Sequence, residues 1–289
     1  MTSPLEEEPK ASSWSFDRTW AEDAGDWVPP QTDPTKVSPA RIYDFLLGGK
    51  DNFEVDREAA SHLLTASPHA RQVAQANRRF LHYAVERMVR DLGIRQIIDL
   101  GTGIPTSPSV HENARRFAPS VRVLYVDHDP VVLAHGRAIL ATDPGTGALL
   151  RDLRDPASIL DDPAARQVID LTQPVGLLFV AVMHFVPFIQ APMLMETYRN
   201  AVPAGSCLAI SAVCRDDSDT EALETAQQMY EKSSARLFAR TKAQFEELFE
   251  GFEFVEPMSP ITRWLSEDHD PADAAALAGG GRAGIGIKV

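Results

Sequence analysis

Residues 97–103, Ile-Ile-Asp-Leu-Gly-Thr-Gly, have the composition of a turn that binds a ligand. An apolar run ends in Asp99, and Gly101, Thr102 and Gly103 follow at once. Glycine adopts positive φ angles and lets the backbone approach a ligand that a Cβ atom would repel. A helix that begins after the turn would offer unpaired N–H groups. The segment predicts a buried strand and a cradle for a nucleotide-like ligand, although an ordinary strand-to-helix turn can also contain two glycines.

A second acid, Asp127, ends the next apolar run, residues 123–126. Ligands of parallel α/β sheets bind beyond the carboxyl ends of the strands, so we expect Asp127 beside the glycine turn. A carboxylate at this position can accept both hydroxyl hydrogens of a ribose. Asp129 precedes Pro130 and is explained as a helix N-cap with proline at the first helical position.

The loop after the glycines distinguishes between two classes of nucleotide ligand. The dinucleotide fingerprint G-x-G-x-x-G needs a third glycine where the helix starts beneath the pyrophosphate. Thr106 stands at that position, with Pro105 and Pro108 beside it. A longer, stiffer loop suits a pyrophosphate poorly, so a ligand without phosphates fits better. An NAD-dependent enzyme is the less favoured alternative.

The elements that must position these residues follow from the alternation of patterns after Ile94. Apolar, strand-like segments alternate with helix-like ones, which is typical of a mostly parallel sheet covered on both faces. Two extended segments at the end of the chain indicate an antiparallel edge strand. We expect an α/β fold with a Rossmann-like sheet of about seven strands. The strand-like segments are 97–100, 121–126, 149–150, 175–182, 206–213, 252–255 and 285–289, and the helix-like segments are 109–117, 130–140, 156–160, 191–201, 219–233 and 244–249.

Three regions are expected along the chain. Residues 1–37 are rich in Pro, Ser, Asp and Glu and predict a flexible arm, although Trp14, Trp20 and Trp27 could instead dock part of it on the body. Residues 38–93 show helical periodicity at 40–47, 55–66 and 68–92 with no strand before them. They form a helical lid or cap. Residues 94–289 form the Rossmann-like core.

Composition limits the possible partners. The 41 acidic and 28 basic residues give a net charge of −13, which repels a phosphate backbone, so we expect no nucleic-acid partner. Two cysteines, Cys207 and Cys214, cannot build a disulfide framework or a cysteine-based zinc site, and no metal is expected. The longest apolar run, 175–182, is too short for a membrane span, and the first residues are acidic where a signal peptide is basic. We expect a cytoplasmic protein, with the oligomeric state left open.

Several motifs together resemble a known family. Asp-Leu-Gly-Thr-Gly at 99–103, Asp127 and Asp152 resemble the motif series of class I S-adenosylmethionine-dependent methyltransferases. The segments 41–53 (Arg-Ile-Tyr-Asp-Phe-Leu-Leu-Gly-Gly-Lys-Asp-Asn-Phe), 77–81, 104–108 and 126–130 resemble more closely an actinobacterial S-adenosyl methyltransferase family first catalogued as a domain of unknown function. The resemblance covers residues 36–289.

This resemblance implies contacts to S-adenosylmethionine as cofactor. Gly101, Thr102 and Gly103 would pass beneath the methionine part, with Asp99 near its amino group. Asp127 would hold the ribose hydroxyls. Asp152 would accept a hydrogen bond from the adenine amine. Leu153 and His128 would pack beside the adenine ring.

The resemblance also implies that residues 41–53 lie over the cofactor as a lid, with contacts from Tyr43 and Asn52. Gly48-Gly49 within it can equally be a helix C-cap. Arg78 could pair with the methionine carboxylate, or lie on a solvated helix face.

His184 follows the fourth strand at the position that borders the methyl group in class I enzymes. It could serve as the catalytic base for a hydroxyl or amine acceptor, or simply pack in a core loop. The loop lacks the Asn/Asp-Pro-Pro-Tyr/Phe signature of enzymes that methylate amino groups of nucleic acids and proteins. We therefore expect a small-molecule acceptor, and the alternative is a noncatalytic protein that binds or senses S-adenosylmethionine.

Overall fold

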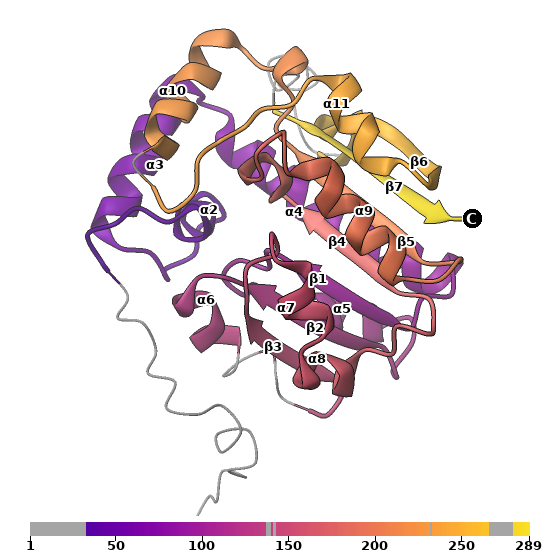
Figure 1. Cartoon of the computed structure of the whole chain (residues 1–289). Helices are drawn as coiled ribbons and strands as arrows, with labels where there is room; N and C mark the ends of the chain where they lie inside the picture. Colours follow the sequence, from indigo (N-terminus) through magenta and orange to yellow (C-terminus); the bar gives the residue numbers. More distant parts are fainter. Residues whose placement is uncertain (1–32, 137–139, 141–142, 232, 266–279) are drawn as a thin grey trace, which may run out of the picture. The chain divides into compact units, whose positions relative to one another are not determined.

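The computed structural model describes residues 33–136, 140, 143–231, 233–265 and 280–289. Within this part, a seven-stranded sheet has the order β3-β2-β1-β4-β5-β7-β6 (Figure 1). Neighbouring strands among β1 to β5 are parallel, and β7 is antiparallel to both β5 and β6. The predicted mixed sheet is confirmed, with β7 inserted one place in from the edge. The strands are β1 (Gln96–Leu100), β2 (Arg122–Asp127), β3 (Thr146–Leu150), β4 (Gly176–Val180), β5 (Cys207–Ala212), β6 (Phe252–Pro260) and β7 (Arg282–Lys288).

The central strands are buried on both faces. Ile97 of β1 packs into one apolar cluster, whereas Ile98 and Leu100 pack into the other, because successive side chains of a strand point to opposite faces. Helices α4 and α5 contribute to the first cluster, and α7, α8, α9 and α11 to the second. This explains why the strands appear as continuous apolar runs rather than alternating ones.

Most of the described α-helices that follow β1 begin at a residue whose side chain caps them. Ser109 and Glu112 form a capping box on α5, and Asp129 and Asp155 accept N–H groups of the first turns of α6 and α7. The N-cap prediction for Asp129 is confirmed. These helices are α5 (Val110–Arg115), α6 (Pro130–His135), α7 (Pro156–Leu160), α8 (Pro163–Val168), α9 (Ala191–Ala201), α10 (Thr220–Glu231) and α11 (Lys242–Glu246).

Between residue 33 and the sheet, the structure contains three α-helices, as the sequence predicts: α2 (Pro39–Leu46), α3 (Glu54–Ala66) and α4 (Ala70–Glu86). Helix α4 packs on the sheet, and α2 and α3 share a small apolar cluster with its first turns, against which Tyr230 of α10 packs. Helices α3 and α10 therefore lie side by side although they are far apart in the sequence (Figure 1). None of the described helices has the length and apolarity needed to cross a membrane.

The fourth strand differs from its prediction. The apolar pattern continues to Val182, but β4 ends at Val180 because Ala181 has a φ of +56°. Such a conformation is unusual for a residue with a Cβ atom and is found preferentially at functional sites. The predicted tryptophan arm falls in residues 1–32, outside the described part of the chain.

Candidate functional site

A cavity of about 420 Å³ lies where the carboxyl ends of β1, β2, β4 and β5 meet helices α2, α3, α4 and α10. This volume is typical of small-molecule sites. We call it the central cavity. Eight of the residues singled out from the sequence line it: Tyr43, Arg78, Asp99, Gly101, Thr102, Gly103, Asp127 and His184.

The glycine turn forms the floor of the cavity. Gly101 and Gly103 have φ angles of +76° and +68°, so both take the backbone conformation that favours glycine. A Cβ atom on Gly101 would lie 2.4 Å from Cγ2 of Val182, whereas one on Gly103 would meet nothing within 4 Å. Gly101 is therefore required by packing inside the protein. Gly103 leaves open space above the backbone.

Asp127 closes the turn from the side of β2. Its Oδ2 accepts the N–H of Gly103 at 2.9 Å, and its Oδ1 accepts the N–H of Asp129 at 2.9 Å. Burial raises the pKa of this carboxyl, and the nearby His128 and the two N–H groups oppose the rise. Each carboxylate oxygen keeps a lone pair, so Asp127 can hold the turn and still accept ligand hydroxyls.

Asp99 contributes a buried carboxyl group to the same wall. Burial raises its pKa to about 7; the guanidinium of Arg78 opposes this rise and the carboxylate of Asp127 adds to it. No basic side chain in the described structure forms an ion pair with Asp99. A cationic group that entered the cavity would stabilise its ionised form.

Arg78 holds the loop that follows the glycine turn. Its Nη2 donates to the carbonyl oxygens of Thr106 at 3.0 Å and Pro108 at 3.2 Å. The side chain also lines the central cavity. Arg78 is therefore not on a solvated helix face, which was one of its two predicted settings. Part of its hydrogen-bonding capacity is used within the protein, and the rest is left for a ligand carboxylate.

A chain of hydrogen bonds connects α2 to the end of β4. The N–H of Ala181 donates to Oγ of Ser211 at 2.9 Å, and that hydroxyl donates to Oδ1 of Asn77. Nδ2 of Asn77 donates to the Tyr43 hydroxyl at 2.8 Å, which donates to the Ala74 carbonyl oxygen at 3.0 Å. The phenol oxygen of Tyr43 therefore has one lone pair that can accept a further hydrogen bond. All five residues line the cavity.

Sequence reasoning missed Asn77 and Ser211 as site residues. Asn77 lies within the motif 77–81 that supports the family resemblance, and Ser211 is the polar residue in the apolar strand β5. These two features of the sequence were the signals that could have identified Asn77 and Ser211 as site residues. Their hydrogen bond joins residues 134 positions apart, so only the folded chain reveals it.

His184 lies on the cavity wall in the turn after β4. Its Nδ1 accepts the N–H of Val213 at 3.4 Å, which leaves the proton of the neutral ring on Nε2. Burial, and to a smaller extent the nearby Arg240, lower its pKa to about 3. The guanidinium of Arg240 is itself buried and donates to the carbonyl oxygens of Met183 and Val186, on either side of His184. The ring is therefore a neutral donor and a weak base.

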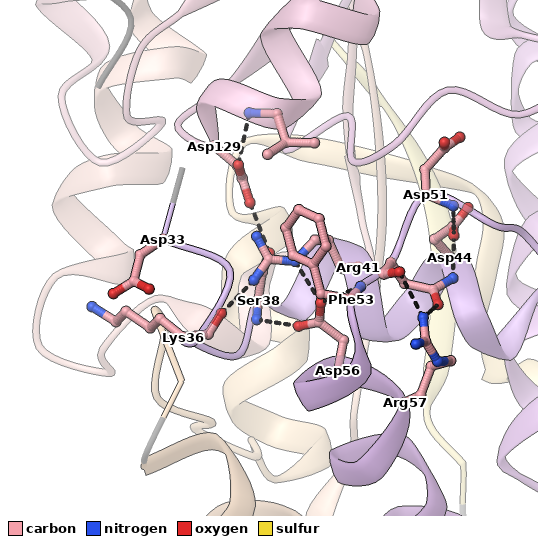
Figure 2. Close-up of polar contacts among 12 residues, drawn as sticks. Asp33, Lys36, Ser38, Arg41, Asp44, Asp51, Phe53, Asp56, Arg57 and Asp129 are labelled. Atoms are coloured by element: carbon pink, nitrogen blue, oxygen red, sulfur yellow. Dashed lines mark hydrogen bonds and ion pairs between the residues drawn. The ribbon is translucent and has the colours of Figure 1, made fainter. Parts of the chain in front are cut away.

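The segment 41–53 is ordered by its own polar contacts (Figure 2). The Asp44 carboxylate accepts the N–H of Asp51 at 2.9 Å and Nδ2 of Asn52 at 2.8 Å, and Oδ1 of Asn52 accepts from Arg57. Gly48 has a φ of +86° after α2, as the C-cap reading predicts. Asn52 is therefore engaged within the segment and does not line the central cavity.

A second network joins this segment to the end of β2 (Figure 2). Oγ of Ser38 donates to Oδ2 of Asp129 at 2.7 Å, and the Ser38 N–H donates to Asp56 at 2.9 Å. Asp56 also pairs with Nε of Arg41 at 2.6 Å, with both side chains buried. Asp129 is two residues from Asp127, which accepts the N–H of Gly103. The hydrogen bond from Ser38 to Asp129 therefore attaches the helical segment beside the glycine turn.

The three residues expected around adenine lie outside the cavity wall. Asp152 forms an ion pair with Arg154 at 2.5 Å, and His128 is 48% exposed. Leu153 packs in the apolar core, and its carbonyl oxygen accepts from Tyr198. The structure thus brings together on the cavity wall the residues predicted for the methionine and ribose parts, whereas the three predicted for adenine lie outside that wall.

Comparisons with known proteins agree with this geometry. A family model described as S-adenosyl methyltransferase matches residues 25–289. A solved protein of Thermobifida fusca YX, described as a candidate methyltransferase, is 38% identical over 91% of this chain and 99% of its own, with a TM-score of 0.83. A DUF574 family protein of Streptomyces avermitilis MA-4680 is 36% identical over 89% of this chain and 99% of its own, with a TM-score of 0.81. No curated protein matches significantly.

Proposed function

The chain belongs to the S-adenosyl methyltransferase family, and we propose that it transfers the methyl group of S-adenosylmethionine to a small-molecule acceptor. When bound, this cofactor supplies an electrophilic methyl group on a positively charged sulfur. The observation that carries the proposal is the convergence of the glycine turn, Asp99 and Asp127 on one wall of the central cavity.

The residues present fit such a ligand. The open space above Gly103 admits a group that would contact the backbone closely. The buried Asp99 carboxyl can pair with the amino group of the methionine part, and Asp127 retains lone pairs for the ribose hydroxyls. Asp152, Leu153 and His128 stay proposed contacts for adenine, along the ends of β2 and β3 beyond the cavity.

The protein contributes alignment and exclusion of water, which are the main requirements of an in-line displacement. Helices α2 and α3 cover the cavity, and the hydrogen bond from Ser38 to Asp129 fastens this cover next to the ribose position. The chain from Ala181 to Tyr43 fixes the backbone at the end of β4 relative to the cover. We assign residues 38–93 the role of a lid on these grounds.

We assign His184 a role other than that of the catalytic base considered from the sequence. With its proton on Nε2 and a pKa of about 3, it would donate a hydrogen bond to the acceptor rather than remove a proton. Replacing it with glutamine, which keeps a donor, should retain more methyl transfer than replacing it with leucine. Equal loss in both variants would contradict this role.

Methyl transfer itself is tested with purified protein, methyl-labelled S-adenosylmethionine and a cell extract separated into small molecules and macromolecules. We expect label in the small-molecule fraction with the wild type and none with Asp127→Ala. Label in nucleic acid or protein would contradict the acceptor class. Binding of S-adenosylmethionine without any transfer would contradict catalysis and favour a sensing protein.

A further inference from the structure

The central cavity has a second end, and its wall is apolar. Beyond the glycine turn, the lining residues come from α3, from the turn after β4, and from α10 and the segment that follows it. We call this end the apolar chamber. Its wall includes Leu63, Phe185, Leu223, Ala226, Tyr230 and Leu237.

Helix α10 turns an apolar face toward this chamber. Ala222, Leu223, Ala226 and Tyr230 recur at helical spacing and all line the cavity, yet none of the residues in α10 is fully buried. Its glutamates lie at exposed positions on the rest of the helix surface. An apolar helix face that borders an open cavity gains free energy when an apolar ligand displaces water from it.

Three ionisable groups of the chamber wall have partners within the protein, whereas the buried Nδ1 of His69, which also lines the cavity, has none among the described residues. Arg282 forms a two-bond ion pair with Asp217, at 2.5 and 2.9 Å. Asp219 accepts the N–H of Ala222 at 3.0 Å at the start of α10. His184, where the chamber meets the glycine turn, is held neutral by its contact with the N–H of Val213. An anionic ligand would lose its hydration here without gaining a free cation in the described wall, because Arg282 is already paired with Asp217.

We propose that the chamber binds the body of the methyl acceptor, and that this acceptor is largely apolar and carries no negative charge. The identity of the occupant as acceptor rests on the proposed function. The chemistry of the chamber does not, because it follows from the wall alone. Carboxylates and phosphate esters are the classes that this wall disfavours.

Two fluorescent probes that share one ring skeleton test the chemistry directly. N-phenyl-1-naphthylamine is uncharged, and 8-anilino-1-naphthalenesulfonate adds a sulfonate to the same skeleton. We expect the uncharged probe to bind the wild-type protein at least tenfold more tightly. Equal or tighter binding of the sulfonate would overturn the proposal.

Variants of α10 locate the probe. Leu223→Asp places a charge on the chamber wall, and Gln228→Asp places the same charge on an exposed position of the same helix. Ala226→Phe fills the chamber without adding a charge. We expect Leu223→Asp and Ala226→Phe to weaken the uncharged probe at least tenfold and Gln228→Asp to change it less than twofold. Unchanged affinity in both chamber variants would overturn the proposal.

Calorimetry with S-adenosylmethionine on the same proteins separates the two hypotheses. The chamber variants should keep the cofactor affinity of the wild type within about twofold, because their substitutions lie away from the glycine turn. This also shows that they are folded. If the wild type binds the uncharged probe but not S-adenosylmethionine, the proposed function fails and the chemistry of the chamber stands. If it binds S-adenosylmethionine but not the uncharged probe, the proposal for the chamber fails and the proposed function stands.

Discussion

Asp99 is a buried carboxyl whose charge depends on what enters the cavity. With a pKa of about 7, a large share of the molecules hold it protonated at neutral pH, and a ligand ammonium group would bind the ionised form. The affinity for S-adenosylmethionine should therefore rise with pH between 5.5 and 7, at close to tenfold per unit in the acidic part of this range. Calorimetry at several pH values measures this slope.

Asp99→Asn is the control for that slope, since asparagine keeps the shape and loses the titration. Its affinity should be weak and nearly independent of pH. The same slope in Asp99→Asn would show that another group titrates.

The raised pKa of Asp99 has the opposite consequence for folding of the unliganded wild type. The folded state holds the Asp99 proton more tightly than the unfolded state, so the contribution of Asp99 to stability falls as pH rises toward 7.

The two glycines of the turn should respond differently to the same substitution. Gly101→Ala forces a Cβ atom against Val182 and strains the backbone, so we expect about 3 kcal/mol or more of lost stability in a denaturant titration. Gly103→Ala carries only the backbone strain of about 1–2 kcal/mol, but its Cβ enters the space assigned to the ligand. Gly103→Ala should therefore lose more cofactor affinity than its lost stability explains. Full cofactor affinity in folded Gly103→Ala would argue against a ligand above this turn.

At the scale of elements, we expect the proposed lid to depend on the buried pair of Arg41 and Asp56. Arg41→Met leaves the Asp56 carboxylate buried without its cation, which should destabilise the protein by about 3–5 kcal/mol. Arg236→Met breaks an exposed ion pair with Glu231 and should cost no more than about 1 kcal/mol. Thermal and denaturant unfolding compare the two variants. Similar small losses in both would show that the Arg41 contact does not hold the lid.

The elements also show what the sequence could predict. Apolar periodicity located most helices and strands, because each buries a regular face. It overestimated β4, since the positive φ of Ala181 depends on a hydrogen bond to Ser211 of another strand. It missed α8, a short helix of six residues with little periodicity of its own. Asp127 and the glycine turn were predictable because they end or directly follow strands, whereas the contact of His184 with Val213 joins residues 29 positions apart.

At the scale of the whole molecule, the site is assembled from segments that are distant along the chain. The methyl-donor end comes from β1 and β2, and the apolar chamber from α3 and α10. The net charge of −13 favours the approach of a cationic ligand such as a sulfonium and opposes that of a polyanion. Fold and charge thus agree with the proposal of a cationic cofactor beside an apolar acceptor that carries no negative charge.

Isothermal titration calorimetry of the wild type and Asp127→Ala with S-adenosylmethionine, S-adenosylhomocysteine and NAD tests the central claim most directly. The account predicts affinity of about micromolar order for the first two ligands and none for NAD. Asp127→Ala should lose about 2–4 kcal/mol of binding, on the order of a hundredfold, with circular dichroism confirming that it is folded. Binding of NAD alone, or an unchanged dissociation constant in Asp127→Ala, would contradict the assignment of this cavity to S-adenosylmethionine.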